Sequence, residues 1–220
     1  MTFTKITCAG AGTMGSQVAW QMAFHGKRVT VYDAIPAGLE RGKAFHREYA
    51  ELFARHRGAT EQQIADSFER PTYTTDLSAA VSDADLISES VPESMDIKQS
   101  FWRDASQHAA RHTVFTTNTS TLTPSQLVHF VDRPRQFLAL HFAIGVWDSN
   151  IGEVMGHPGT DRELFESVLT FTQEIGLVPI PSTRNRAATS STPCWCPGAQ
   201  RRWISSSEMS LTTRASTAPG

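Results

Sequence analysis

Short apolar runs alternate with longer amphipathic segments over most of the chain. Residues 5–9 predict a buried strand, residues 14–25 carry apolar side chains at helical spacing, and residues 28–32 predict a second strand. Two charged, helix-compatible stretches follow between residues 37 and 68, and they are broken at Gly58. Because this connection is longer than the usual crossover between two strands, it predicts a helical excursion.

The alternation of strand and helix segments continues to residue 180. We predict strands at residues 85–90, 113–117, 137–142, 153–155 and 177–180, and helices at residues 95–111, around 126 and at 161–176. Strands that alternate with helices form a parallel sheet covered on both faces. The sequence therefore predicts an α/β fold, a Rossmann-type, doubly wound and mainly parallel sheet with a helical excursion after the second strand.

The pattern stops at Pro181. From there to residue 220 about a third of the residues are Ser or Thr, Lys is absent, and apolar side chains follow no helical or strand period. A segment of this composition cannot bury enough apolar surface to offset the entropy of ordering. We therefore predict one domain over residues 1–180 and a disordered or irregular tail of low complexity over residues 181–220.

Composition narrows the expected partners. The chain has 220 residues and a formal net charge of -2, without a dense stripe of Lys and Arg, so neither a nucleic acid nor an anionic membrane is expected. No apolar run approaches the roughly 20 residues of a membrane span, and the N-terminus enters a strand-like segment instead of a signal peptide, which predicts a cytoplasmic protein. Cys8 stands alone, and Cys194 and Cys196 have no second ligand pair at metal spacing, so no metal site is expected.

A glycine-rich turn joins the first predicted strand to the first predicted helix. It has the form G-x-G-x-x-G, and the residues expected to bind a cofactor are Gly10, Gly12, Thr13, Met14 and Gly15. The glycines allow a tight turn and a close approach of backbone to a pyrophosphate at the helix N-terminus. Asp33 ends the second strand about twenty residues on, where a carboxylate can accept both ribose hydroxyls and would repel a 2′-phosphate. NAD is therefore the predicted cofactor, in preference to NADP; the alternative is a glycine-rich turn with an unrelated surface Asp.

Three further segments extend this pattern, namely Glu-Ser-Val-Pro-Glu at residues 89–93, Thr-Asn-Thr-Ser at 117–120 and Leu-His-Phe at 140–142. Together with the glycine-rich turn, their order and spacing resemble the NAD-binding domain of the 3-hydroxyacyl-CoA dehydrogenases, over roughly residues 3–180. The resemblance implies NAD-dependent oxidation of a 3-hydroxyacyl-CoA to the 3-ketoacyl-CoA, in fatty acid or short-chain acyl-CoA metabolism. An acyl-CoA is then the expected substrate.

The resemblance also implies roles for individual residues. In that family a Glu and a Lys five residues later lie near the nicotinamide ribose, and Glu93 and Lys98 have this spacing; the alternative is an ordinary ion pair on a helix surface. The family's Ser in its Asn-Thr-Ser loop binds the substrate oxygen at C3, which corresponds to Ser120. Asn118 lies beside it at the carboxyl end of a predicted strand, where open α/β sheets place ligands, and is expected to contact the cofactor.

His141 and Glu153 are the candidate catalytic pair. Oxidation of a secondary alcohol needs a base for the hydroxyl proton while hydride leaves for the nicotinamide, and a neutral imidazole titrates in the right range. A carboxylate on the next strand can hold the other ring nitrogen, and Glu153, twelve residues on, fits the family's spacing for that partner. The alternative for His141 is a hydrogen-bonded core residue at the end of an apolar strand.

Two segments depart from the family pattern. The family follows its His with a short segment that contains Asn and often Pro, whereas residues 143–147 here are Ala-Ile-Gly-Val-Trp, which puts the acyl specificity in doubt. The family also continues into a helical domain that supplies a substrate-contacting Asn and the dimer interface, and nothing after Ile180 resembles it. A family-type homodimer is therefore doubtful for this chain.

The sequence of the tail matches a displaced reading frame. Codons can be chosen that spell PIHKEPRGYILNSMLVP, the Gly-Tyr and Asn-bearing apolar helix that the resemblance leads us to expect. Read one base later, the same codons give PSTRNRAATSSTPCWC, which is residues 181–196. We predict a frame error or a natural frameshift near the codons of Ile180 and Pro181; the alternative is a genuine low-complexity tail.

Two other functions compete with the acyl-CoA dehydrogenase hypothesis. The first is a binding module, a fragment that holds the dinucleotide but has lost turnover together with its second domain. The second is a related dehydrogenase that acts on a free hydroxy acid or sugar acid. An ultraviolet assay with acetoacetyl-CoA or with free acids separates these possibilities.

Overall fold

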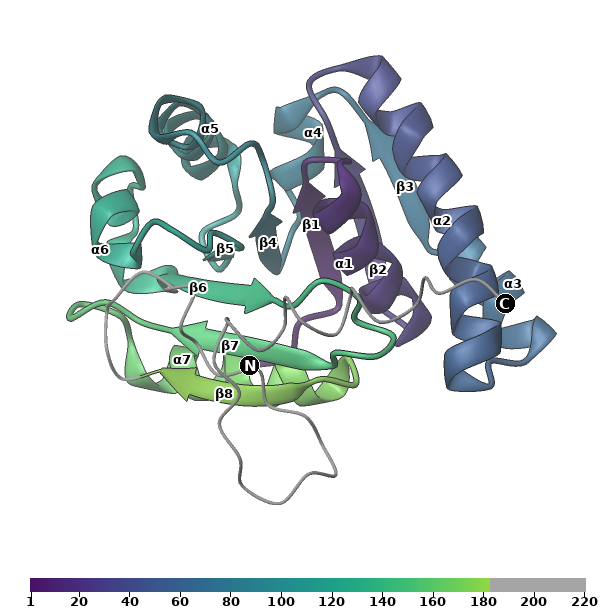
Figure 1. Cartoon of the computed structure of the whole chain (residues 1–220). Coiled ribbons are helices and arrows are strands. Elements are labelled where there is room, and N and C mark those ends of the chain that lie inside the picture. Colours follow the sequence, from purple (N-terminus) through teal and green to yellow (C-terminus); the bar gives the residue numbers. More distant parts are fainter. Residues whose placement is uncertain (183–220) are drawn as a thin grey trace, which may run out of the picture.

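The computed structural model describes residues 1–182, and the α/β fold is confirmed there (Figure 1). Its strands are β1 Lys5–Ala9, β2 Arg28–Tyr32, β3 Pro71–Thr74, β4 Leu86–Glu89, β5 Val114–Thr117, β6 Phe137–Phe142, β7 Ile151–Met155 and β8 Val178–Ser182. Its helices are α1 Thr13–Phe24, α2 Pro36–Arg57, α3 Glu61–Glu69, α4 Leu77–Val81, α5 Met95–His108, α6 Pro124–Leu127 and α7 Arg162–Glu174, with short 3-10 turns at Val128–Phe130 and Pro134–Gln136. Residues 183–220, and with them nearly all of the predicted tail, lie outside the described residues.

The strands form one sheet in the order β3-β2-β1-β4-β5-β6-β7-β8. Neighbouring strands are parallel, with the exception of β6 and β7, which pair antiparallel. The predicted doubly wound and mainly parallel sheet is thus confirmed. The strand order reverses between β1 and β4, and open α/β sheets bind ligands at the carboxyl ends of strands beside such a reversal.

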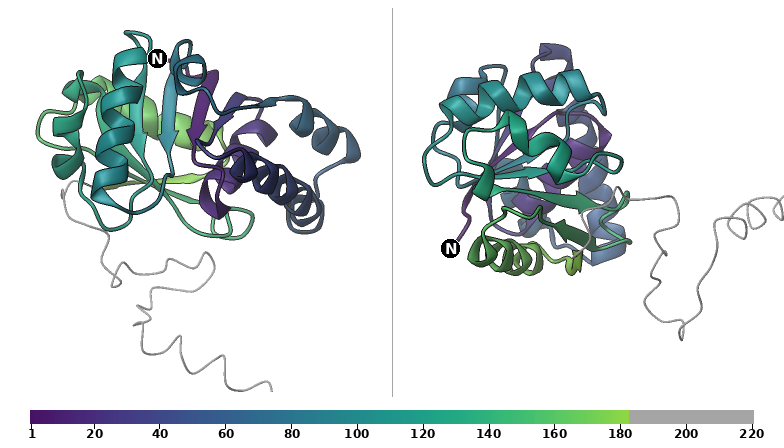
Figure 2. Two further views of the ribbon diagram at one scale, coloured as in Figure 1. Left: turned by 90° about the horizontal axis from the view of Figure 1, so that it is seen from above. Right: turned by 90° about the vertical axis from the view of Figure 1, so that its left-hand side faces the viewer.

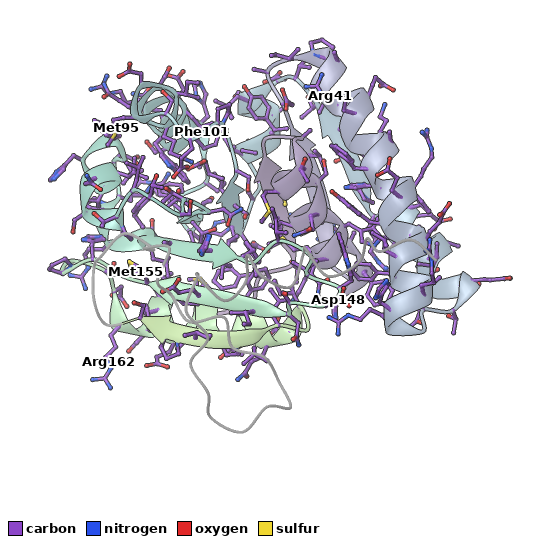
Figure 3. All side chains as sticks on the ribbon, viewed as in Figure 1. Arg41, Met95, Phe101, Asp148, Met155 and Arg162 are labelled. Carbon is purple, nitrogen blue, oxygen red and sulfur yellow. The ribbon has the colours of Figure 1, made fainter. Side chains whose placement is uncertain are left out.

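Helices cover both faces of the sheet, and each face has its own apolar core. One core lies under α1, α2 and α7, and includes Trp20, Phe53 and Phe171. The other lies under α4, α5 and α6, and includes Phe101 and Trp102 of α5. Figure 2 shows α5 and α7 on opposite sides of the sheet, and Figure 3 labels Phe101 on the first of these helices.

The predicted helical excursion is present and breaks where expected. Helix α2 ends at Gly58, whose φ of +62° lies in the left-handed region that favours glycine. Helix α3 then starts with a capping box, in which the Thr60 side chain accepts from the Gln63 backbone N–H while the Gln63 side chain accepts from Thr60 N–H. None of the helices in the described part is long and apolar enough to span a membrane.

Some elements differ from the sequence prediction. Strand β3 was not predicted because its sequence, Pro-Thr-Tyr-Thr, has no apolar run, and helix α4 was not predicted because five residues are too few to show a helical hydrophobic period. Helix α5 ends three residues early, where the backbone of Ala109 becomes extended, and the Arg133 guanidinium donates to the carbonyl oxygen of Ser106 in the last turn and to those of Ala109 and Ala110 just beyond it. Strand β8 runs on to Ser182, two residues into the predicted tail, as the edge strand where proline is tolerated.

A buried histidine ties the excursion to α1. His46 of α2 is 1% exposed, its Nε2 lies 3.0 Å from the Ser16 carbonyl oxygen, and its Nδ1 lies 2.7 Å from the Tyr73 hydroxyl. A carbonyl oxygen can only accept, so Nε2 carries the proton and Nδ1 accepts from Tyr73. Burial lowers the pKa of His46 to about 4, against the hydrogen bond to Ser16, which acts in the opposite direction.

This depressed pKa predicts acid sensitivity. Unfolding returns His46 to its ordinary pKa of 6.5. The free energy of unfolding should therefore be highest above pH 6.5 and should decrease as the pH drops toward 4. The expected loss is on the order of 3 kcal/mol at most. Urea unfolding at several pH values measures it. His46→Leu should flatten the pH dependence in this window, whereas a variant of the exposed His129 should retain it; parallel profiles for the two would contradict the assignment.

Candidate active site

The glycine-rich turn between β1 and α1 has no room for side chains at two of its positions. Gly10 has a φ of +96°, and a Cβ there would lie 2.5 Å from the carbonyl oxygen of Ser90 at the end of β4. A Cβ on Gly15 would lie 1.8 Å from the carbonyl oxygen of Gly10. These contacts require glycine and bring the start of α1 close to the strands on either side of the order reversal.

The second glycine of the turn, Gly12, leaves open space. Gly12 is the N-cap of α1, no side chain caps it, and a Cβ built on it meets no described atom within 4 Å. The first-turn N–H groups of α1, beginning with Thr13 and Met14, are therefore free of a capping side chain and carry the positive end of the helix dipole. This arrangement fits a pyrophosphate, so the predicted cofactor residues at 10–15 suit a dinucleotide.

Asp33 follows β2 and is held in place by backbone groups. Its Oδ2 accepts from the N–H of Ala11 in the glycine-rich turn at 2.9 Å, and its Oδ1 accepts from the N–H of Ile35 at 2.9 Å. A Cβ on Gly38 would lie 2.6 Å from the Asp33 Cγ, so glycine at that position makes room for the carboxylate. Each carboxylate oxygen has a second lone pair, which leaves Asp33 able to accept from ribose hydroxyls.

Glu93 and Lys98 form a pair, but not on the surface of a helix. Lys98 is 1% exposed, and its Nζ lies 2.6 Å from Oε1 of Glu89 and 3.1 Å from Oε2 of Glu93. It also donates to the Val91 carbonyl oxygen at 3.4 Å. Three acceptors thus face the three N–H donors of the ammonium group. Lys98 is therefore part of a buried network and not of an ordinary ion pair on a helix surface.

Glu89, at the end of β4, completes this buried network. Its side chain is fully buried, and it accepts from the Thr117 hydroxyl at 2.7 Å and from the Val91 N–H at 3.0 Å, in addition to Lys98. Burial raises the pKa of Glu89, and the ammonium of Lys98 opposes this shift. Glu89 belongs to the Glu-Ser-Val-Pro-Glu segment, but it was assigned no role from the sequence. The feature that could have identified it is a carboxylate at the end of an otherwise apolar strand.

Glu93 extends the network to the loop that holds Ser120. Its Oε1 accepts from the hydroxyl of Thr119, and from the N–H and hydroxyl of Thr121 at 3.2 and 2.6 Å. Burial acts to raise the pKa of Glu93, but these hydrogen bonds and Lys98 outweigh it and lower the pKa to about 2. Ser120 is exposed between the two anchored threonines, so its hydroxyl is presented on a loop fixed from both sides.

Asn118 joins the carboxyl ends of three strands. Its Oδ1 accepts from the N–H of Phe142 at the end of β6, at 2.9 Å, and its Nδ2 donates to the Ser90 hydroxyl beyond β4 at 3.1 Å. Asn118 itself follows β5. The side chain therefore sets the positions of the neighbouring loops, and its predicted contact with the cofactor remains a prediction.

The antiparallel pairing of β6 and β7 brings the predicted catalytic pair together. His141 is the direct cross-strand partner of Glu153, and its Nδ1 lies 3.7 Å from Oε2 of Glu153. The side chains are 29% and 18% exposed, so neither is sealed in the core. At this distance the carboxylate can stabilise an imidazolium, and the contact can tighten to a hydrogen bond when substrate binds. Among the described residues, no cluster of three or more His, Cys, Asp or Glu could hold a metal ion.

Comparison with known proteins decides the family. The family model of the 3-hydroxyacyl-CoA dehydrogenase NAD-binding domain matches residues 5–185. The chain belongs to this family. Its cofactor is accordingly NAD, as the glycine-rich turn and Asp33 predict.

Individual relatives agree with this assignment. The chain is 28% identical over 180 residues to human mitochondrial hydroxyacyl-coenzyme A dehydrogenase, which covers 80% of this chain and 57% of the human protein. It is 29% identical over 177 residues to the fatty acid oxidation complex subunit alpha of a Shewanella strain, covering 80% of this chain and 25% of that subunit. The chain thus spans little more than half the length of the human relative.

One solved structure has a higher sequence identity to this chain than these two relatives have. The structure of a diketoreductase, described with its substrate-directed dual catalysis of dicarbonyl compounds, superposes with a TM-score of 0.83 at 41% identity. The match covers 86% of this chain and 67% of that one.

The cofactor assignment predicts discrimination between dinucleotides. NADH should bind this family member more tightly than NADPH, by about tenfold or more, because Asp33 would face a 2′-phosphate of the same charge. Asp33→Ala should narrow the difference in a titration of nucleotide fluorescence. Asp76→Ala is the matched control, since Asp76 also accepts a backbone N–H, that of Ala79, but caps the short α4. Equal affinities for NADH and NADPH in the unaltered chain would contradict the role of Asp33.

Proposed function

We propose that this chain is the cofactor-binding domain of an enzyme that oxidises a 3-hydroxyacyl-CoA to the 3-ketoacyl-CoA. The cross-strand pair of His141 and Glu153 carries this proposal, since a general base and its carboxylate partner lie in the sheet that also bears the dinucleotide turn. The similarity to human hydroxyacyl-coenzyme A dehydrogenase supports the thioester substrate.

Each side chain has one task in this mechanism. Bound NAD supplies the acceptor for the hydride that leaves the carbinol carbon. Glu153 holds Nδ1 of His141, which leaves Nε2 to take the hydroxyl proton, and the resulting imidazolium is stabilised by the same carboxylate. The Ser120 hydroxyl donates a hydrogen bond to the substrate oxygen as it becomes a carbonyl. Glu93, Lys98 and Glu89 act through the loop that carries Ser120.

A second candidate is the reduction of a free dicarbonyl compound or the oxidation of a free hydroxy acid. Two observations favour it: the 41% identity to a diketoreductase, and the loop after His141, where Ile144 is 72% exposed. An apolar residue cannot form the polar contacts that an Asn would offer a thioester substrate. NADH oxidation measured with acetoacetyl-CoA and with ethyl acetoacetate, at equal concentrations, separates the two substrate classes. A third candidate is dinucleotide binding without turnover, which requires inactivity with both substrates.

We also propose that residues 181–220 arise from a displaced reading frame, and that the domain ends near residue 180. The sequence of residues 181–196 supports this origin, because a shift of one base can convert it into the segment that the family resemblance leads us to expect.

The catalytic pair generates a kinetic prediction. His141→Gln should lower turnover by about 10²–10⁴-fold with NADH affinity nearly intact, because the base acts mainly in the transition state. Glu153→Gln should lower it less. Steady-state kinetics and NADH titrations, on this chain and on the chain with its frame restored, provide both quantities. Retention of most of the activity by His141→Gln would refute the assignment of the base.

The coding DNA tests the proposed frameshift. Restoring one base near the codons of Ile180 and Pro181 should open a frame that encodes GYILNSMLVP and continues for roughly one further domain. Resequencing of this region is the measurement. A nucleotide sequence that does not encode this segment in either neighbouring frame, or a frame that stops at once, would leave the tail as a genuine part of the protein.

A further inference from the structure

A buried amide side chain on the cofactor helix holds the loop that follows the proposed base. Gln17 lies in the first turns of α1 and is 2% exposed. Its Nε2 donates to the Ala143 carbonyl oxygen at 3.2 Å, and its Oε1 accepts from the Gly145 N–H at 3.0 Å. The two backbone groups belong to one loop, 126 and 128 residues further along the chain. Both polar functions of the amide are thus used on the same short segment.

The same loop is anchored at other points. Asn118 accepts from the N–H of Phe142, directly before it. Further on, the ring of Trp147 lies 5.4 Å from that of Tyr49 on α2, and Asp148, labelled in Figure 3 near the end of α2, pairs with His56 at 3.0 Å. Gly145 has a φ of +75°, which supplies the turn between these anchors. The loop is therefore anchored to α1, to α2 and to the residue that follows β5.

This arrangement leaves the side chain of Ile144 exposed to solvent. It lies between the two backbone groups that Gln17 binds and three residues beyond His141, and it is 72% exposed. Exposure of a large apolar side chain to water is unfavourable, and contact with a hydrocarbon part of a ligand would remove this apolar surface from water. A fixed loop also removes the entropy cost of ordering that side chain when the ligand arrives.

We propose that Gln17 is a positioning residue that holds residues 143–145 so that Ile144 forms an apolar contact with the substrate bound beside His141. The proposal rests on the proposed function, because it assigns Ile144 to the substrate of that same site. A residue of the cofactor helix thus sets the position of the loop residue that contacts the substrate. The ligand group that Ile144 recognises is a hydrocarbon part of the substrate, next to the carbon that is oxidised.

The test compares two buried glutamines of one helix. Gln17→Leu removes both hydrogen bonds to the loop. Gln21→Leu is the matched control, since Gln21 is also fully buried in α1 and donates to a backbone carbonyl oxygen, that of Ile175, at 2.6 Å. Both variants lose a buried polar contact, so both should unfold at lower temperature. Only Gln17→Leu should raise KM for acetoacetyl-CoA or ethyl acetoacetate, by about tenfold, while the Kd for NADH stays within about twofold.

Amide exchange at Gly145 and the KM of an Ile144 variant test the two parts of the proposal separately. Amide hydrogen exchange at Gly145 should be faster in Gln17→Leu than in the unaltered chain or in Gln21→Leu, since its acceptor is gone. Ile144→Ala should raise KM in the same direction as Gln17→Leu without changing exchange at Gly145. Equal KM values for the two glutamine variants, or unchanged exchange at Gly145 in Gln17→Leu, would overturn the proposal. Absence of turnover of either substrate, in this chain and also in the chain with its frame restored, would overturn the proposed function instead, and exchange at Gly145 would then decide whether Gln17 holds the loop.

Discussion

The substrate side of the site depends on one ammonium group that is buried and must be neutralised. Removing a single partner from a buried ion pair costs about 3–5 kcal/mol, because it leaves a charge without compensation. Lys98 of α5 avoids this cost by facing Glu89 at the end of β4 and Glu93 beyond it. Glu93 in turn fixes the threonines on either side of Ser120. The ion pairs of Lys98 at the carboxyl end of β4 thereby help to fix the position of the Ser120 hydroxyl, which we propose binds the substrate.

Amide side chains perform a related task around this network. An amide has both donors and an acceptor, so a buried Asn or Gln can join two backbone segments that share no regular hydrogen bonding. Asn118 links the ends of β4 and β6, and Gln17 links α1 to residues 143–145. The loops at the carboxyl ends of the strands are therefore fixed by side chains, which gives a site of defined shape on segments that are not helical or extended.

The two halves of the site relate differently to the family. The cofactor half has the family's glycine-rich turn and Asp33, and a side chain at Gly10 or Gly15 would meet a backbone atom, whereas one at Gly38 would meet the Asp33 carboxylate. The substrate half departs from it between Ala143 and Trp147, where no comparable steric limit acts on Ile144. Cofactor choice is thus constrained by the fold, whereas substrate choice can change through a loop of a few residues.

Local constraints can be read from the amino-acid sequence alone. The turn at Gly10 and Gly15, the break at Gly58 and most strands and helices follow from backbone conformation and hydrophobic period, which neighbouring residues define. The pairing of His141 with Glu153 was expected only from family spacing, and the antiparallel register of β6 and β7 realises it. The residues that Glu89 and Gln17 contact could not be predicted from the sequence. Their partners become neighbours only when the order of the strands folds distant segments together, and no local pattern encodes that contact.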